Sequence, residues 1–460
     1  MTTATLERTM FSTKRVMEFF SVKELNMQLG QSRAMWPIAL LKELLDNALD
    51  AAELAGVTPS VGVTLTPDAF SVQDNGPGLP EETLVRSLDY LVRVSDKNYY
   101  ISPTRGQLGN ALKCVWAAPF VADGNHGQVD VTTGGVRHEI AVRLDRIAQE
   151  PDVRHTRHPD RTARTGTRIT IHWPGIASYE APDRDDAFLQ MEEDEEEIAS
   201  YQDRDESPIF LQMLDLVHRF ALFNPHAMLT VKQPKTKPIR WTPTDTAWRK
   251  WQPDRPTSPH WYDPGRLRAL IAAYLANEGE GGRARTAREF VSEFAGLKGS
   301  GKQHVVTTAA GLSKGAYLHD LVTEDDIALK PVARLLAAMQ EASRPITPAA
   351  LGTIGREHLA ARLEAAGLGA ESIQYKKVLG VDKGVPFVVE IAFGIHEDRS
   401  HVREVTVGLN WSPALHVPVA ELSTFLGTAR VDPWDPVTML VHIACPRFEW
   451  TDRGKSAVAV

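Results

Sequence analysis

Residues 35–55 carry the hydrophobic period of an α-helix. Four apolar residues, spaced three or four apart, fall on one side of it: Leu41, Leu44, Leu45 and Ala48. Glu43, Asn47 and Asp50 stand at positions i, i+4 and i+7, within roughly 60° of one another on the other side. The pattern predicts an amphipathic helix that buries its leucines and presents two carboxylates and a carboxamide together.

Short runs of alternating apolar and polar residues predict strands elsewhere in the first half of the chain. They cover residues 60–66, 69–73, 127–132, 137–143, 167–173 and 227–232. A further helix is predicted over residues 208–222. Because helices and alternating strands are mixed without a regular strand–helix–strand repeat, the expected fold class is α+β, with an α/β sandwich in this half.

The second half of the chain divides by pattern as well. Residues 233–262 are rich in Pro, Trp, Thr and Lys with little periodicity, which is typical of a linker. Residues 264 to about 369 are mostly helical in pattern. Residues 373–460 return to strands, with clear apolar runs at 386–393, 403–409 and 437–443. We therefore expect three domains.

Composition narrows the class of protein. The 460 residues carry a formal net charge of −8, which argues mildly against a general nucleic-acid coat but leaves room for a local basic patch. Part of the acidity lies in the run 192–197, which is predicted to be a solvated surface. Cys114 and Cys445 form no disulfide framework, and no apolar run is long enough to span a bilayer. We expect a cytoplasmic protein without a membrane segment.

The polar side of the 35–55 helix has two readings. Carboxylate and amide oxygens suit Mg²⁺ chemistry, since an amide oxygen can ligate the ion while a carboxylate holds an attacking water. The alternative is a solvated acidic face. Three glycine-bearing motifs follow it along the chain: Asp74-Asn-Gly76-Pro-Gly78, Arg105-Gly106-Gln107-Leu108-Gly109-Asn110, and Thr165-Gly-Thr167. Glycines let backbone approach a ligand closely, and a loop that runs into a helix offers N–H groups to phosphates.

The four motifs together resemble those of the GHKL (Bergerat-fold) ATPases. That resemblance implies ATP and Mg²⁺ as ligands, Glu43 as the general base and Asn47 as the metal ligand. It implies that Asp74 accepts a hydrogen bond from the adenine amino group, and that Gly78 forms a wall of the adenine pocket. The full set of nucleotide-binding residues that it implies is Asn47, Asp50, Asp74, Gly76, Gly78, Ser95, Lys97, Arg105, Gly106, Gln107, Leu108, Gly109, Asn110 and Thr167. Residues 106–110 would belong to a lid over the phosphates, where Ala111 replaces a glycine usual in the family.

Further segments resemble the B subunit of type IIB DNA topoisomerase (topoisomerase VI). They are residues 94–97 and 104–107, 223–227, 290–303, 346–357 and 386–390, and the loop 451–456. The resemblance implies an ATPase domain with an N-terminal strap at 1–233, a linker at 234–263, a helical helix-two-turns-helix domain at 264–345 and an α/β transducer domain at 346–460. It makes residue 386 the start of the first transducer strand. Lys455 would be the switch lysine that reaches the γ-phosphate.

Two functions remain open at this stage. The first is the ATPase subunit of a topoisomerase VI-like enzyme, an ATP-dependent homodimer that closes around DNA while a separate Toprim/winged-helix subunit cuts. The family's B subunit continues past the switch-lysine loop into a helix that docks onto its A subunit, and this sequence ends at Val460. The alternative is therefore a stand-alone ATP-gated DNA clamp or signalling module in repair or genome defence. Six basic residues of the helical segment are candidates for DNA contact: Arg283, Arg285, Arg288, Lys298, Lys302 and Lys314.

Overall fold

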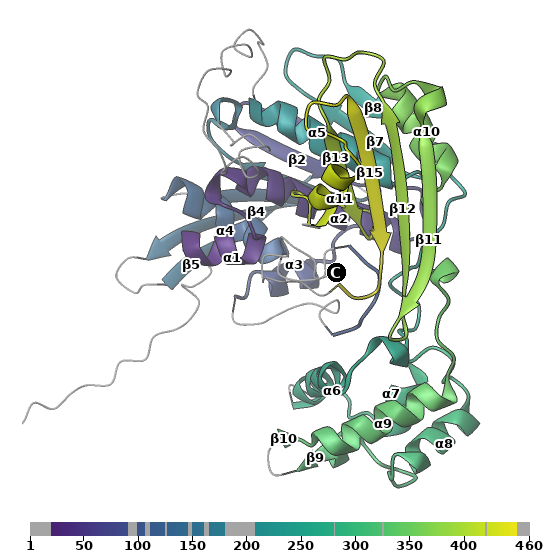
Figure 1. The fold of residues 1–460 in the computed structure, drawn as a ribbon. Helices are drawn as coiled ribbons and strands as arrows, with labels where there is room; N and C mark the ends of the chain where they lie inside the picture. The colour runs from purple at the N-terminus through teal and green to yellow at the C-terminus, as the bar shows by residue number, and fades with distance from the viewer. Residues whose placement is uncertain are drawn as a thin grey trace, which may run out of the picture.

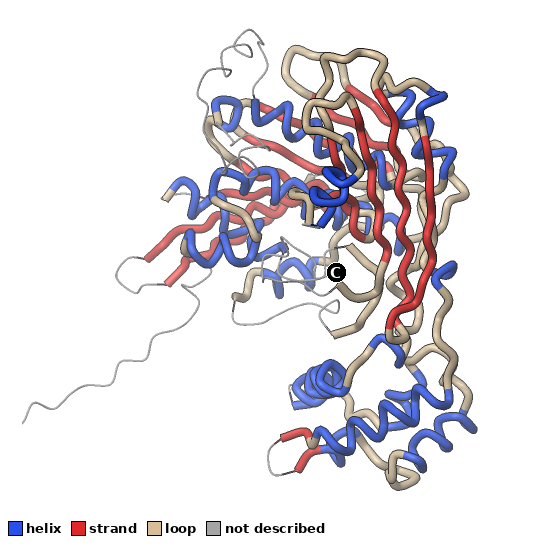
Figure 2. The backbone as a smooth tube through the Cα atoms, viewed as in Figure 1, coloured by secondary structure: helices blue, strands red, loops and turns tan. Residues whose placement is uncertain are grey.

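A computed structural model of the chain describes most of its length. The described residues are 20–90, 99–105, 111–124, 127–145, 150–160, 165–179, 208–279, 281–323, 326–418 and 421–448. Two β-sheets lie beside each other and a mostly helical body lies apart from them (Figures 1 and 2). The mixed architecture confirms the α+β class predicted from the sequence.

The first sheet has eight strands in the order β5-β4-β3-β6-β2-β1-β7-β8. Its strands are β1 (Ser60–Thr66), β2 (Ala69–Gln73), β3 (Gly127–Thr133), β4 (Val136–Asp145), β5 (Glu150–Pro159), β6 (Thr167–His172), β7 (Met228–Lys232) and β8 (Ile239–Trp241). All neighbours are antiparallel except β1 and β7, which run parallel. The two outermost strands, β5 and β8, were not anticipated from the sequence.

Helices cover one face of this sheet and leave the other face polar. Helices α2 (Trp36–Leu54), α4 (Ala111–Asp123) and α5 (Pro208–Phe223) pack on its strands. Helix α1 (Val22–Leu29) packs on α4, and α3 (Glu81–Ser87) follows the turn after β2. Along β1, Val61, Val63 and Leu65 are buried beneath the helices, whereas Ser60, Gly62 and Thr64 alternate with them on the opposite face. The leucines of α2 are buried as the periodicity predicts.

The helical body has a hydrophobic core of its own. It contains α6 (Pro264–Gly279), α7 (Ala287–Ser292), α8 (Ser300–Ala309) and α9 (Leu329–Ala342), with the two-residue strands β9 (Val322–Thr323) and β10 (Asp326–Ile327). Thr286 caps α7 in a reciprocal capping box with Glu289, which fixes where that helix begins.

The second sheet has five strands in the order β11-β12-β15-β13-β14. They are β11 (Gln374–Asp382), β12 (Val385–Ile395), β13 (Glu404–Leu409), β14 (Ser412–Pro413) and β15 (Val437–Ala444), accompanied by α10 (Arg356–Ala365) and α11 (Glu421–Thr428). The strand that begins near residue 386 is therefore the second of this sheet, not the first. The mostly exposed residues of β11 do not alternate between apolar and polar, so no periodic signal marks this strand.

The predicted linker is more ordered than its composition indicated. Its residues include β8 and a short 3₁₀ helix, η5 (Pro259–Trp261), and three of its tryptophans, Trp248, Trp251 and Trp261, are buried. Trp248 packs into the core shared with the second sheet, while Trp251 and Trp261 belong to the core of the helical body. The segment thus joins the other parts of the molecule by burying its aromatic side chains. Among the described helices, none is both long and apolar enough to cross a membrane.

Candidate functional site

Helix α2 presents different environments along its length. Pro37 stands in its first turn, where proline is tolerated, and Ala- and Leu-rich sequence carries the helix to Leu54. Glu43 and Asn47 are half-buried, whereas Asp46, Asp50 and Glu53 are buried. The Asn47 carboxamide has no hydrogen-bond partner among the residues that the structure describes. The middle of the helix therefore keeps a polar pair in a partly open position.

The turn 74–78 lies against α2. Asp74 follows β2, and its backbone N–H donates to the Thr167 carbonyl at 2.9 Å. Its Oδ1 accepts hydrogen bonds from the N–H groups of Gly76 at 2.8 Å and Thr167 at 3.2 Å. A Cβ on Gly76 would lie only 3.2 Å from the Ala51 backbone, so this turn and α2 are in close contact. The Asp74 turn, residues 165–167 and the second half of α2 thus converge.

Two glycines make that convergence sterically feasible. Gly78 has a φ of +94°, and a Cβ there would lie 2.8 Å from Thr133 Oγ1. Gly166 has a φ of +76°, and a Cβ there would lie 2.0 Å from the Asp74 carbonyl oxygen. Both positions require glycine for backbone conformation as well as for space. The glycines predicted as close-approach positions are therefore needed to assemble the turn itself.

Asp74 is a buried carboxylate whose Oδ1 is hydrogen-bonded within the protein. Burial raises its pKa, and the backbone hydrogen bonds from Gly76 and Thr167 offset only part of that rise. Oδ2 accepts no hydrogen bond from the described part of the chain. A buried carboxylate oxygen without a protein donor is suited to accept a hydrogen bond from a ligand.

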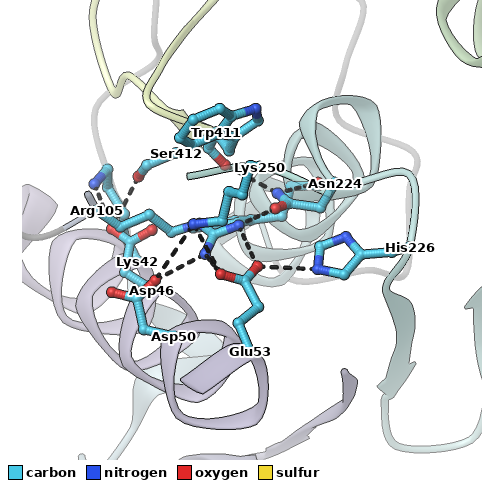
Figure 3. Close-up of polar contacts among 11 residues, drawn as sticks. Lys42, Asp46, Asp50, Glu53, Arg105, Asn224, His226, Lys250, Trp411 and Ser412 are labelled. Atoms are coloured by element: carbon cyan, nitrogen blue, oxygen red, sulfur yellow. Dashed lines mark hydrogen bonds and ion pairs between the residues drawn. The ribbon is translucent and has the colours of Figure 1, made fainter. Parts of the chain in front are cut away.

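The C-terminal half of α2 is occupied by a buried ion cluster (Figure 3). The Arg105 guanidinium donates from Nη1 to Asp50 at 2.8 Å, and both of its terminal nitrogens contact the Glu53 carboxylate at 2.9 Å. It also donates to the side-chain oxygen of Asn224. Arg105 is 1% exposed, so its charge is compensated entirely within the protein.

Lys250 enters the same cluster from the segment predicted to be a linker. Its ammonium lies 2.8 Å from Glu53 and 4.8 Å from the centroid of the Trp411 ring, in the second sheet's domain. His226 contributes its Nε2, 3.0 Å from Glu53. Burial alone would raise the pKa of Glu53, but the attraction of Arg105 and Lys250 and the His226 hydrogen bond hold it well below its usual range.

A second contact ties α2 to the turn between β13 and β14. Ser412 donates to Asp46 at 2.8 Å, and Asp46 also pairs with Lys42 at 2.9 Å. Trp411 in that turn has a φ of 65°, a region that bulky residues seldom adopt, and its carbonyl accepts from Asn224 at 2.9 Å. The cluster therefore joins α2 to residues 99–105, to the α5–β7 connection, to Lys250 and to the second sheet.

The structure sorts the residues predicted from the sequence. Glu43, Asn47, Asp74, Gly76, Gly78 and Thr167 lie on the converging elements described above. Asp50 and Arg105 are paired with each other in the ion cluster, which gives them a positioning role; direct contact of either with a nucleotide stays a prediction. Ser95, Lys97, Gly106, Gln107, Leu108, Gly109, Asn110 and Lys455 lie outside the described residues.

Several residues of the cluster were missed. Glu53 and Asp46 stand on the same helix as Glu43, and the periodic argument did not distinguish them. Asn224 and His226 belong to a segment noted only for its resemblance, without an assigned role. Lys250 carried no signal, because an isolated lysine in a Pro- and Trp-rich stretch indicates neither burial nor pairing.

The donor set fits a nucleotide with its magnesium ion. Among the described residues no group of three His, Cys, Asp or Glu side chains could hold a metal by itself. Mg²⁺ is commonly held by one or two protein ligands together with substrate phosphates and water. Asn47, with its unbonded carboxamide beside Glu43 on one helix face, is the described side chain best suited to ligate it.

Comparison with known proteins finds distant relatives by sequence. No family model matches the chain. The B subunit of type 2 DNA topoisomerase 6 from Archaeoglobus fulgidus is 23% identical over 450 residues, 92% of this chain and 66% of the relative. The corresponding subunits of Natronomonas pharaonis and Pyrococcus horikoshii are 29% and 30% identical over 168 residues, 35% of this chain. Those two matches cover 21% and 29% of the relatives' own lengths.

Solved structures give weaker similarity. The 43K ATPase domain of Thermus thermophilus gyrase B, in complex with an aminocoumarin, has a TM-score of 0.36 at 13% identity, covering 97% of this chain and 86% of that one. The ATPase region of Saccharomyces cerevisiae topoisomerase II has a TM-score of 0.39 at 8% identity, covering 92% and 77%. At these scores the solved structures carry no argument about this chain. Over most of its length it is a distant homologue of the B subunit of type 2 DNA topoisomerase 6.

Proposed function

We propose that this chain binds and hydrolyses ATP, and that ATP brings two copies together as a gate on DNA. The observation that carries the proposal is the convergence of α2, the Asp74 turn and residues 165–167. These elements place a half-buried carboxylate–carboxamide pair on the same helix that packs against a buried carboxylate with an uncommitted oxygen. In this arrangement Glu43 would hold the attacking water, Asn47 would hold a metal ion, and Asp74 would bind the adenine ring.

Glu43 is the proposed general base. A carboxylate activates water when it can accept a proton while the water is held in line with the γ-phosphate. Its half-buried place on α2 gives such a water access without full solvation. Asn47, one turn further along, would hold Mg²⁺, which when bound supplies positive charge to the phosphate oxygens.

Asp74 is the proposed anchor for the adenine amino group. Oδ1 is held by two backbone N–H groups, so the carboxylate is fixed in orientation before any ligand arrives. Gly76 and Gly78 keep the adjoining backbone close and leave no side chain in the way. Thr167 supports the site through its N–H group.

The gate itself is inferred from how α2 is attached. The buried ion cluster and the Asp46–Ser412 hydrogen bond fasten this helix to the second sheet, which corresponds to the predicted transducer domain. Through these contacts, a movement of α2 when nucleotide binds would shift the neighbouring domain. The relatives are named as the B subunit of their enzyme, so we propose that a separate DNA-cleaving subunit acts with this chain.

Light scattering tests the proposal. A non-hydrolysable ATP analogue with Mg²⁺ is expected to convert monomers to dimers, and Asp74→Asn is expected to prevent the change at the same analogue concentration. Saturating analogue that binds, by calorimetry, without any change of mass would contradict the gate. Absence of analogue binding would contradict the nucleotide site itself.

A further inference from the structure

The edge of the first sheet carries a basic hairpin on the face opposite α2. It consists of β7, β8 and the loop between them, residues 228–241. We propose that this hairpin, with the polar sheet face beside it, binds the phosphate backbone of double-stranded DNA. The proposal rests on the proposed function in that DNA is the substrate of the gate, and it names the surface that contacts it.

Four cations lie within nine residues of the hairpin: Lys232, Lys235, Lys237 and Arg240. All four are exposed, and none has a hydrogen bond or ion pair to the part of the chain that the structure describes. In a chain with a net charge of −8, this is a concentrated group of positive charges that no described acidic side chain pairs with. Duplex DNA carries one negative charge per about 1.7 Å of axis, so a short row of cations meets several phosphates.

A polar hollow of about 490 Å³ adjoins the hairpin. Lys232 and Arg240 line it together with the hydroxyl-bearing side chains of Thr64 and Thr230. Gly62 lies opposite Thr230 in the β1–β7 register, and a Cβ there would meet nothing within 4 Å, so the floor of the hollow is open backbone. Hydroxyls and cations together are the groups that most often contact phosphate oxygens.

The lining contains one carboxylate, Asp74, which stands after β2, two strands away from β7. Its Oδ1 accepts hydrogen bonds from the N–H groups of Gly76 and Thr167, and the residue is 9% exposed. Neither Lys232 nor Arg240 forms an ion pair with Asp74 or with another acidic side chain in the part of the chain that the structure describes. Among the described residues, no carboxylate pairs with these two cations, so they can meet an anionic partner.

The basic residues of the helical body are placed differently. Arg283 pairs with Glu289 at 2.6 Å, and Arg285 pairs with Glu293. Lys302 donates to the Gly296 carbonyl at 2.9 Å, and Arg288 donates to that of Ser300 at 2.7 Å. Two of these six charges are thus paired with carboxylates, and two further side chains are held by backbone carbonyls. The β7–β8 hairpin is the better-placed surface.

Position on the sheet adds a functional argument. Lys232 and Arg240 share the face of Gly62 and Thr64, whereas α2 packs on the other face. DNA seated there would leave Glu43 and Asn47 accessible to nucleotide. Because the hollow also reaches Asp74, the proposed adenine anchor, the DNA contact is assigned to its Lys232 and Arg240 end, two strands away from β2.

The test measures binding of a labelled 40-base-pair duplex by fluorescence anisotropy between 50 and 300 mM salt. The variants are Lys232→Gln/Arg240→Gln and Lys235→Gln/Lys237→Gln. Each phosphate contact contributes about −0.9 to the slope of log affinity against log salt, so each double variant is expected to flatten the slope by roughly 2. At ~0.1 M salt the affinity should fall between about tenfold and one-hundredfold.

The matched control is Lys298→Gln/Lys314→Gln, which removes the same charge from exposed positions of the helical body. An unchanged slope in both hairpin variants would overturn the proposal and leave the lysines a role in keeping the edge strand from pairing. An equal loss in the control would also overturn it, in favour of the helical body. Analogue-induced dimerisation without DNA should persist in the hairpin variants, so failure of this inference is distinct from failure of the gate.

Discussion

The middle and the C-terminal half of α2 carry the same kinds of polar side chain in different environments. Glu43 and Asn47 are half-buried, and the Asn47 carboxamide makes no hydrogen bond to the described chain. Seven and ten residues after Glu43, Asp50 and Glu53 are buried and paired with Arg105 and Lys250. A carboxylate's role on this helix is therefore decided by what faces it, and periodicity alone does not reveal it.

The carboxylates in the C-terminal half of α2 are fully paired for a physical reason. Removing charges from water costs several kcal/mol per ion, so a buried carboxylate is retained only with close, hydrogen-bonded cations. The groups contributed by α2 are met by groups from Arg105, Asn224, His226 and Lys250, which come from three separate segments. The result fixes the C-terminal half of α2 in place, whereas the Asn47 carboxamide in the middle of the helix makes no hydrogen bond to the described chain.

The largest expected effect is on catalysis by the middle of the helix. Glu43→Ala removes the proposed general base, and hydrolysis should fall by roughly 10²- to 10⁴-fold. ATP binding should persist, because the adenine contact lies at Asp74. Steady-state phosphate release together with calorimetric binding checks both statements. Hydrolysis at the parental rate would show that another group is the base.

Breaking the paired half should affect stability instead. Lys250→Met leaves Glu53 with less compensation, and the free energy of unfolding should fall by about 3 kcal/mol or more. Denaturant titration measures this. Lys232→Met, an exposed lysine without a described partner, serves as the control and should shift stability by less than about 0.5 kcal/mol. Equal effects at both positions would remove the distinction between the two environments.

A smaller effect is expected at the Asp74 turn. Asp74→Asn keeps an Oδ1 that can accept from Gly76 and Thr167, so the turn should remain folded. The second oxygen is replaced by an amide NH₂ group, which donates where the adenine amino group needs an acceptor. A hydrogen bond to a charged group contributes ~1.5–3 kcal/mol, so nucleotide affinity should fall at least about tenfold. Calorimetry with ATP, beside a thermal melt for folding, provides the comparison. Parental affinity would return Asp74 to a purely structural role.

Low pH should reduce the contribution of the buried Glu53 charge to the stability of the fold. The pKa of Glu53 in the folded chain lies well below the ordinary value of 4.5, so its charge stabilises the fold above that pH. That contribution is lost as pH falls through the folded-state pKa. The stability gap between the parent and Glu53→Gln, measured by denaturant titration, should therefore be full near pH 7 and narrow below about pH 4.5. A gap independent of pH would contradict this account.

The sequence predicted the periodic parts of the molecule well. Helix α2, strands β1 and β2, and helix α5 lie within a residue or two of the predicted positions, because one face of each is buried. The edge strands β8 and β11 were missed, since short or two-sidedly exposed strands lack alternation. The order of the glycine motifs along the chain suggested a shared site through the resemblance. No local pattern in the sequence shows that they meet in space.

The ion cluster could not have been predicted. Arg105 and His226 stand 52 and 173 residues from Glu53 along the chain, and Lys250 stands further still, so their meeting depends on the tertiary fold. Burial of Lys250 was the least expected, because its stretch has the composition of a linker. The resemblance predicts which residues meet a nucleotide, and the packing shows which of them are paired within the protein.

The most direct test is a matched pair of substitutions on one helix, Glu43→Gln and Glu53→Gln. For each variant, the rate of ATP hydrolysis per folded molecule and the free energy of unfolding are measured in the same buffer. We predict that Glu43→Gln loses hydrolysis and stays within about 1 kcal/mol of the parent in stability, whereas Glu53→Gln loses about 3 kcal/mol and retains hydrolysis. If both variants lost both properties alike, or if the two effects were exchanged, the division of roles along α2 would be wrong.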